Sequence, residues 1–362
     1  MKKIPIYKPK LSGNEKKYVN QCLDSVWISS KGEFISKFEE KFSNFLNVGY
    51  STSVSNGTVA LHLALAALGI GKGDEVIVPT LTYIASVNAI AYVGAEPVFA
   101  DSHNNTWNID PNKLLELITP KTKAIMVVHL YGNSCDMDSI VKICQERDIF
   151  LIEDAAEAFG TKYNNKYVGT FGDVATFSFF GNKTITTGEG GMLVTNNKLL
   201  IDKAYYLKNQ GVSSNKEYWH DGIGFNYRMT NICAAIGLAQ LEGAEVVLQK
   251  KTKIASWYRE FLEGIQVKFQ DEQAGSTHSY WMVTVLVKDK NTRDKVRLYL
   301  ENHNVETRPT FYPAHKMPVF YSEKTFPVSE SISDKGMNLP SSPNLIKSDV
   351  KYICKLIAEA IK

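Results

Sequence analysis

The chain has 362 residues, of which 44% are hydrophobic and 22% are charged, so it can bury a large core and a disordered chain is excluded. Lysine and arginine number 41 against 38 aspartates and glutamates, which gives a formal net charge of +3. So small an excess gives no argument for a nucleic-acid partner.

Short apolar runs alternate with helix-like segments over much of the chain, from about residue 51 to residue 241. Three of these runs are rich in β-branched residues and predict buried strands, at Glu75–Val78, Lys123–Val128 and Ile149–Glu153. Helical patterns lie between them, at Ile84–Val93 and Met137–Arg147. This order predicts an α/β fold, with a mostly parallel sheet and helices on both of its faces.

The pattern changes near residue 245, where a long, charged amphipathic helix begins and continues through Phe261. Beyond it the sequence predicts a few more strands and helices, at Tyr280–Val287, near Val305, and over Arg293–Asn302 and Val350–Ile361. We therefore expect a large domain over 1–244 and a smaller α+β domain over 245–362.

A polar segment precedes an apolar helix that we expect over Val59–Leu68. In this segment Asn56 can cap the helix, and Gly57 lets another group approach the backbone closely. The free N–H groups of a helix start favour an anion such as phosphate. The alternative is a capped helix without a ligand.

Two polar or aromatic residues follow predicted strands at the edge where α/β sheets bind ligands. Tyr83 comes after the strand that stops at Pro79, and its ring can stack on a planar cofactor or pack in the core. Asp154 follows the strand that begins near Ile149. It can cap a helix, or pair with the protonated pyridine nitrogen of pyridoxal phosphate (PLP).

Lys183 lies in an unusual setting, because a strand rich in phenylalanine runs there into a polar, glycine-rich loop. A lysine that forms a Schiff base needs partial desolvation to lower its pKa, and small neighbours so that a substrate can reach it. Ser178, upstream of it, can bind phosphate with its hydroxyl. An ordinary surface lysine is the alternative that this segment alone leaves open.

Four motifs follow one another in the chain: Asp154-Ala-Ala-Glu-Ala158, Phe177-Ser-Phe-Phe-Gly-Asn-Lys183, Gly188-Glu-Gly-Gly191 and Gly224-Phe-Asn-Tyr-Arg-Met229. In this order they resemble the DegT/DnrJ/EryC1/StrS family of sugar aminotransferases. The similarity runs from Trp27-Ile-Ser-Ser-Lys-Gly32 to Arg308-Pro-x-Phe-Tyr-Pro-x-His315. It implies the aspartate aminotransferase fold (fold type I), with PLP as cofactor and no metal.

The resemblance also implies roles for individual residues. Lys183 would carry the cofactor as a Schiff base and shuttle the proton. Gly57, Thr58 and Ser178 would form the phosphate site, and Asp154 would pair with the ring nitrogen. Tyr83 would stack on the ring, and Glu157 would lie near the ring hydroxyl. Asn226 would reach the phosphate of the neighbouring subunit. The resemblance therefore implies a homodimer with shared active sites, which leaves a tetramer open.

The implied reaction moves an amino group from L-glutamate to a nucleotide-linked 4-keto-6-deoxy sugar, with the GDP-linked mannose derivative favoured. A UDP- or dTDP-linked 4-keto-6-deoxyglucose stays open as the alternative acceptor. A PLP-dependent sugar dehydratase typically has histidine in place of the lysine, and a regulatory relative would have lost site residues. Lys183, Asp154 and Ser178 are all present, which argues against both.

Six further residues are candidates for substrate contacts. Arg228 or Arg308 can clamp a carboxylate or phosphate with a planar guanidinium, although ordinary ion pairs are an equal alternative for each. The remaining candidates are Trp27, Ser30, Lys31 and His315. For Trp27, anchoring the N-terminal arm to the core is the alternative that we favour.

The sequence also bears on cellular location. Residues 3–10 carry prolines and lysines where a signal peptide needs an apolar run. The apolar stretch Thr58–Ile70 is shorter than the roughly 20 residues that span a bilayer. The five scattered cysteines form no Cys-x-x-Cys pair, which argues against a zinc site or a disulfide framework. We therefore expect a cytoplasmic protein that does not bind a membrane.

Overall fold

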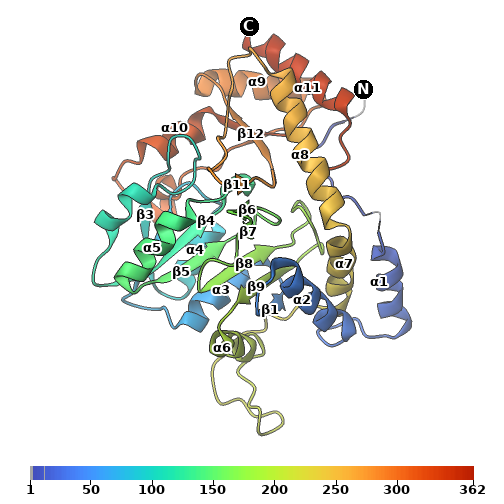
Figure 1. Ribbon diagram of the computed structural model, residues 1–362, viewed down its shortest axis with the longest axis vertical. Helices are drawn as coiled ribbons and strands as arrows, with labels where there is room; N and C mark the ends of the chain where they lie inside the picture. The colour runs from blue at the N-terminus through green and yellow to red at the C-terminus, as the bar shows by residue number, and fades with distance from the viewer. Residues whose placement is uncertain (1–2, 12) are drawn as a thin grey trace.

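A seven-stranded sheet with the order β1-β9-β8-β5-β4-β2-β3 lies at the centre of the larger part of the molecule (Figure 1). In this computed structural model, which describes residues 3–11 and 13–362, every strand of the sheet runs parallel except β9. Strand β9 pairs antiparallel with both β1 and β8. The strands are β1 (Tyr50–Val54), β2 (Glu75–Pro79), β3 (Glu96–Ala100), β4 (Thr122–Val128), β5 (Phe150–Asp154), β8 (Val174–Ser178) and β9 (Gly191–Thr195).

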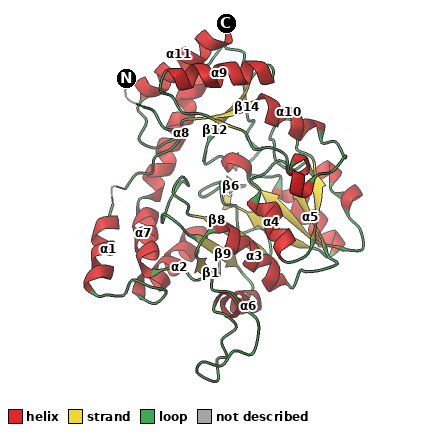
Figure 2. Ribbon diagram, turned by 180° about the vertical axis from the view of Figure 1, so that it is seen from behind, coloured by secondary structure: helices red, strands yellow, loops and turns green. Residues whose placement is uncertain are grey.

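Helices cover both faces of this sheet and bury their apolar sides against it (Figure 2). One face packs against α3, α4 and α6, whereas the other packs against α2, α5 and α7. Helix α1 packs against α7. The bounds are α1 (Glu15–Asp24), α2 (Glu33–Leu46), α3 (Gly57–Leu68), α4 (Ala85–Tyr92), α5 (Met137–Arg147), α6 (Lys198–Lys208) and α7 (Asn231–Glu242).

The chain leaves the large sheet along α8 (Ala244–Phe261), which leads to a smaller antiparallel sheet with the order β10-β12-β14-β13 (Figure 1). Helices α8, α9 and α11 share a separate apolar core with this sheet. The elements are β10 (Lys268–Phe269), β12 (Val283–Leu286), β13 (Arg308–Pro309), β14 (Gly336–Leu339), α9 (Lys290–Asn302), α10 (Pro327–Lys335) and α11 (Lys347–Ile361). A third small sheet joins β6 (Lys162–Tyr163), β7 (Lys166–Tyr167) and β11 (Ser276–Thr277), and 3-10 turns lie at Pro111–Lys113, Leu115–Leu117, Leu130–Gly132, Ala314–Lys316 and Pro318–Phe320.

The predicted fold class is confirmed, since a mostly parallel sheet covered by helices is joined to a smaller antiparallel unit. The predicted elements are present, with ends that differ by up to three residues. The strand expected from Tyr280 begins only at Val283, because Tyr280 has a φ of 51°, which a β-strand does not permit. The division at residue 245 stays a prediction. Ile4, near the N-terminus, pairs with Val305 of the smaller unit.

Strand β8 shows how the sequence orients a site residue. Side chains alternate between the two faces of a strand. The ring of Phe177 packs 5.1 Å from that of Phe42 of α2, between ring centres, on one face. The next residue, Ser178, therefore faces α3 on the other side.

No helix of the described chain is by itself long and apolar enough to cross a membrane. Helices α7 and α8 meet that test of length and composition only as a pair, and they are bent by 62° relative to each other.

Candidate active site

Four of the predicted site residues lie at one edge of the large sheet, where its parallel strands end. Asp154 is the last residue of β5 and Ser178 the last of β8, and Glu157 and Lys183 follow shortly after them. Helix α3 begins at the same edge, because β1 before it runs parallel to β8. This is the edge at which open α/β sheets bind ligands.

The start of α3 comes so close to the end of β8 that only glycine fits at position 57. A Cβ atom on Gly57 would lie 2.8 Å from Cβ and 3.1 Å from Oγ of Ser178. Asn56 caps the helix, since its side-chain oxygen accepts a hydrogen bond from the N–H of Val59 at 3.0 Å. Thr58 follows in the first turn. The N–H groups of this turn and the Ser178 hydroxyl form a corner that suits an anion such as phosphate.

Asp154 has a buried carboxylate that is held from two sides. Its Oδ2 accepts a hydrogen bond from the Ser86 hydroxyl at 2.7 Å, and its Oδ1 accepts one from the N–H of Ala156 at 3.1 Å. Burial raises the pKa of Asp154, while Ser86, the Ala156 N–H and the Lys183 amine favour the charged form. A cation beside Asp154 would therefore meet a carboxylate that is fixed in place and shielded from water.

The neighbouring Glu153 anchors the end of β5. Its buried carboxylate lies 3.0 Å from Nε2 of His129 and accepts hydrogen bonds from three N–H groups of the loop 169–172. Burial alone would raise the pKa of Glu153, but the hydrogen bonds from His129 and the backbone lower it. Because these groups fix Glu153, they also fix the strand position of Asp154.

The amine of Lys183 lies between a carboxylate and an aromatic ring. Its Nζ is 4.0 Å from Oε1 of Glu157 and 3.9 Å from the ring centre of Trp281. Burial lowers the pKa of the Lys183 amine, and Glu157 and Asp154 oppose this shift. Burial also raises the pKa of Glu157. Both groups are thereby pushed toward their neutral forms, and a neutral amine can act as a nucleophile or a base.

A row of aromatic residues from distant parts of the chain leads to this amine. Tyr83 packs on Phe311 at 5.7 Å, Phe311 stacks on Tyr131 at 5.3 Å, and Tyr131 stacks on Trp281 at 6.3 Å, all between ring centres. The N–H of Tyr131 also donates to Glu157 at 2.8 Å. The Tyr7 hydroxyl donates to the backbone oxygen of Lys183 at 2.8 Å. The packed rings therefore form a continuous row from Tyr83 to Lys183, and two of them, Phe311 and Trp281, come from the smaller part of the chain.

Our reading of the sequence missed several of these residues. Ser86 holds Asp154, Tyr7 and Trp281 contact Lys183, and Tyr131 contacts Glu157, but no local motif marks the three aromatic residues. Only Ser86 lies close to a residue that the sequence singled out, in the helix that follows Tyr83.

Asn226 and Arg228 lie near the start of α3. Arg228 pairs through its backbone with Val54, at the end of β1. Its guanidinium donates two hydrogen bonds to Oδ1 of Asn226, at 3.2 and 2.9 Å. Asn226 is itself exposed. Both residues are thus close to the corner formed by Gly57 and Ser178, with Asn226 facing outward.

The segment of Trp27, Ser30 and Lys31 is tied to the start of α7. The side chain of Asn231 donates to the backbone oxygen of Trp27 at 2.7 Å. Trp27 and Lys31 line a hollow of about 440 Å³ together with Phe34. Among the described residues, this segment forms hydrogen bonds with the start of α7 and not with Lys183.

Arg308 and His315 differ in their surroundings. Arg308 is half-exposed, and its Nη2 lies 3.8 Å from Oε1 of Glu306. His315 is buried, with Nδ1 2.7 Å from Oγ1 of Thr80 and Nε2 3.0 Å from Oε1 of Glu330. Both ring nitrogens of His315 have partners within the chain, so a nucleotide would have to displace one of them.

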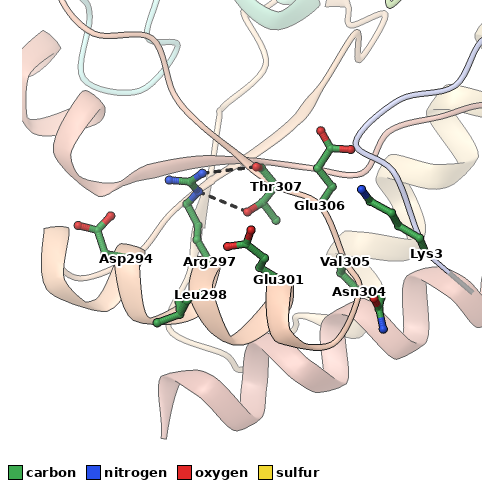
Figure 3. Close-up of a pocket in the computed structure, with 9 residues that line it drawn as sticks. All are labelled: Lys3, Asp294, Arg297, Leu298, Glu301, Asn304, Val305, Glu306 and Thr307. Carbon is green, nitrogen blue, oxygen red and sulfur yellow. Dashed lines mark hydrogen bonds between the residues drawn. The ribbon is translucent and has the colours of Figure 1, made fainter. Parts of the chain in front are cut away.

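A polar groove of about 420 Å³ lies beside α9, between Lys3 and the segment 304–307 (Figure 3). Arg297 crosses it, and its guanidinium donates to the side chain and the backbone oxygen of Thr307 at 3.3 and 3.5 Å. Its lining residues come from the smaller part of the chain and from Lys3. The groove is therefore separate from the Lys183 cluster.

Comparison with known proteins identifies the family. The model of the DegT/DnrJ/EryC1/StrS aminotransferase family matches residues 9–358. The chain belongs to this family. This aminotransferase is 58% identical over 361 residues to the GDP-perosamine synthase of Escherichia coli O157:H7, with 99% of each chain covered. It is 53% identical over 359 residues to the GDP-perosamine synthase of Vibrio cholerae, with 98% of each chain covered.

Solved structures agree with this assignment. The PLP form of Spr1654 from Streptococcus pneumoniae matches the aminotransferase with a TM-score of 0.95 at 26% identity, over 99% of both chains. The enzyme depends on PLP, and its residues fit this cofactor. Gly57 leaves room beside Ser178 that a Cβ atom would fill, Asp154 is a buried carboxylate, and Lys183 has an amine of lowered pKa.

An added methyl group at position 57 tests the phosphate corner. We expect Gly57→Ala to weaken PLP binding by about tenfold to a hundredfold, because overpacking costs roughly 1–3 kcal/mol. Equilibrium dialysis of PLP measures this loss. Gly243→Ala is the control, since a Cβ atom there approaches only the Gln240 oxygen, at 3.8 Å. Equal PLP affinity in the wild type and Gly57→Ala would place the phosphate elsewhere.

Proposed function

We propose that this aminotransferase moves the amino group of L-glutamate to C4 of GDP-4-keto-6-deoxy-D-mannose, which yields GDP-perosamine and 2-oxoglutarate. The observation that carries this proposal is the identity of 58% and 53%, over nearly the whole chain, to two enzymes named GDP-perosamine synthase. Lys183, Asp154 and Ser178 are all present, which supports the proposal, because a relative that does not catalyse transamination would not need all three residues.

Bound PLP supplies a carbonyl carbon that takes up the amino group and a ring that withdraws electrons from the substrate carbon. We assign its phosphate to Gly57, Thr58 and Ser178 at the start of α3. Asp154 would bind the protonated ring nitrogen, since a buried carboxylate stabilises a cation beside it.

Two more residues complete the proposed cofactor site. Tyr83 would cover the ring face, because its own ring already belongs to the aromatic stack that leads to Lys183. Glu157 would lie near the ring hydroxyl, because its carboxylate is 4.0 Å from the Lys183 amine.

Lys183 would carry the proton in both halves of the reaction. Its Nζ accepts a proton from the α-carbon of glutamate and later delivers a proton to C4 of the sugar. Burial favours the neutral amine, so Nζ can accept a proton near neutral pH. Trp281 covers one side of the amine and shields it from water, which keeps the proton from being lost to solvent.

Arginines and a polar segment are the proposed substrate contacts. Arg228 lies beside the phosphate corner, and its planar fork suits a carboxylate or phosphate. Arg308 is exposed enough to do the same from the smaller unit. The remaining proposed contacts to the sugar nucleotide are Trp27, Ser30, Lys31 and His315.

A spectrum of the purified enzyme tests the reaction. We expect a visible absorption band of bound PLP that L-glutamate bleaches and GDP-4-keto-6-deoxymannose restores. A band that glutamate bleaches but only a UDP- or dTDP-linked ketone restores would reject the GDP-sugar assignment. A band that glutamate leaves unchanged would reject glutamate as the donor.

We also propose that two copies of the chain share their active sites. Asn226 is exposed, and it follows a loop that projects from the molecule below α6 (Figure 1). Tyr218 and Ile223 of this loop are 96% and 92% exposed, which is unusual for large apolar side chains in an isolated chain. A second copy that covers the loop would bring Asn226 to the neighbouring phosphate. Association of two dimers into a tetramer is compatible with this arrangement.

The asparagine is tested by replacement. We expect Asn226→Ala to bind PLP about tenfold to a hundredfold more weakly, because one hydrogen bond to a charged group contributes roughly 1.5–3 kcal/mol. Dialysis measures the loss, and Asn112→Ala on an exposed 3-10 turn is the control. At limiting PLP, mixing Asn226→Ala with Lys183→Ala subunits should recover activity, since one site of each mixed dimer has both residues. If the subunits exchange between dimers but activity does not recover, each chain forms its active site without residues of the other.

We further propose that the enzyme works in the cytoplasm. All five cysteines are free thiols in the described structure, which suits a reducing compartment. Fractionation of cells that express the enzyme, followed by activity measurements on each fraction, tests this location.

A further inference from the structure

One face of the Lys183 amine is covered by Trp281, which lies just before β12. Its ring centre is 3.9 Å from Nζ of Lys183, and its side chain is only 5% exposed. The face of an indole ring carries negative charge density and attracts an ammonium group, most strongly where water is excluded. Oε1 of Glu157 lies 4.0 Å from the same Nζ.

Trp281 is held in this position by three separate contacts. Its Nε1 donates to the backbone oxygen of Asn182, the residue before Lys183, at 2.8 Å. Its ring stacks on Tyr131, with an angle of 16° between the planes. Its backbone oxygen accepts a hydrogen bond from the buried amine of Lys251 at 3.2 Å. Rotation of the indole away from Lys183 would break the first two contacts.

The charged and titratable groups around Lys183 come from three segments. Asp154 ends β5 and Glu157 follows it, and both favour the ammonium form. Tyr7 of the N-terminal arm contacts the backbone of Lys183, and the amine of Lys251 in α8 lies over the Tyr7 ring at 4.9 Å. Burial lowers the pKa of Lys251 to about 7. Unlike these groups, the indole of Trp281 attracts the ammonium form without itself gaining or losing a proton.

We propose that Trp281 is a further catalytic residue, whose indole face holds the ammonium form of Lys183 between proton transfers. The proposal rests on the transamination chemistry and not on the identity of the sugar. When Nζ takes one proton from the donor carbon, the charge of Lys183 rises by one. When Nζ delivers one proton, that charge falls by one. A buried ammonium needs compensation, and the ring provides it only while the charge is present.

Fluorinated tryptophans at position 281 test the proposal without changing the shape of the side chain, because fluorine withdraws the charge density of the ring face. The readout is the rate at which the cofactor-free enzyme captures PLP on Lys183 across a range of pH, fixed with borohydride and located by peptide mass. Capture needs the neutral amine, so its midpoint reports the pKa of Lys183. The titration of PLP itself is common to all variants.

We expect the midpoint to fall stepwise with each added fluorine, by about one pH unit in total. Trp281→Leu should give a similar fall, and Trp281→Phe a smaller one. Trp257→Leu is the matched control, since Lys250 lies over that ring at 4.6 Å in the smaller core, and it should leave the midpoint unchanged. The glutamate half-reaction should show the same shift in the acid limb of its kcat profile.

An unchanged midpoint across the fluorinated series would overturn the proposal, even if Trp281→Leu fails to fold. A fall in Trp281→Leu without a graded effect of fluorine would also overturn it, because only the volume of the side chain would then matter. PLP capture is measured without any sugar. A wrong assignment of the acceptor therefore leaves this result untouched.

Discussion

Lys183→Ala should lower kcat by about 10⁴-fold or more, because the variant loses both the proton carrier and the covalent link to PLP. We expect the effect in both half-reactions, since the same Nζ serves each of them. Rapid mixing with L-glutamate, with the PLP band as signal, measures the first half-reaction. Addition of the keto-sugar to the aminated enzyme measures the second.

The control for this variant is Lys142→Ala. Lys142 is exposed on α5 and lies 3.9 Å from Glu146, a surface pair that contributes little to stability. Circular dichroism of both variants should match that of the wild type. Turnover of Lys183→Ala at more than a small fraction of the wild-type rate would assign the proton transfer to another group.

Asp154→Asn should lower kcat by about 10²- to 10⁴-fold, because removal of one partner of a buried ion pair costs roughly 3–5 kcal/mol. The amide keeps the size of the side chain but cannot balance the positive charge of a protonated ring nitrogen. PLP should also dissociate more readily. Stopped-flow kinetics and dialysis measure the two effects.

Asp202→Asn is the matched control, since Asp202 is exposed on α6, where it pairs with Lys198. This variant should retain wild-type rates. If Asp154→Asn retains the wild-type rate, the role of Asp154 is purely structural: it accepts hydrogen bonds from the Ser86 hydroxyl and the Ala156 N–H.

The sequence predicted those features that depend on neighbours along the chain. Apolar strands such as Lys123–Val128 and the amphipathic helix Met137–Arg147 show their periods locally, and both elements are present within a residue of the predicted ends. The order of strands and helices was enough to place Tyr83 and Asp154 at the edge where α/β sheets bind ligands, because parallel strands end on the same side.

Contacts between distant segments were not predictable in this way. Trp281 reaches Lys183 from the smaller unit, and Tyr7 reaches it from the N-terminal arm. Nothing in their own neighbourhoods distinguishes these aromatic residues from ordinary core residues. Ser86 was missed for a different reason: a serine in the first turn of a helix is common, and its partner Asp154 lies on another strand.

The enclosure of Lys183 by residues from both ends of the chain has a consequence during synthesis. Tyr7 and then Lys183 leave the ribosome before Trp281, and at about 5–20 residues per second the interval between Lys183 and Trp281 is on the order of ten seconds. During this interval the nascent chain has Lys183 and Asp154 but lacks the indole that covers the amine. The Lys183 site is therefore enclosed only late in synthesis, and until then its amine is open to solvent from the side that the indole later covers.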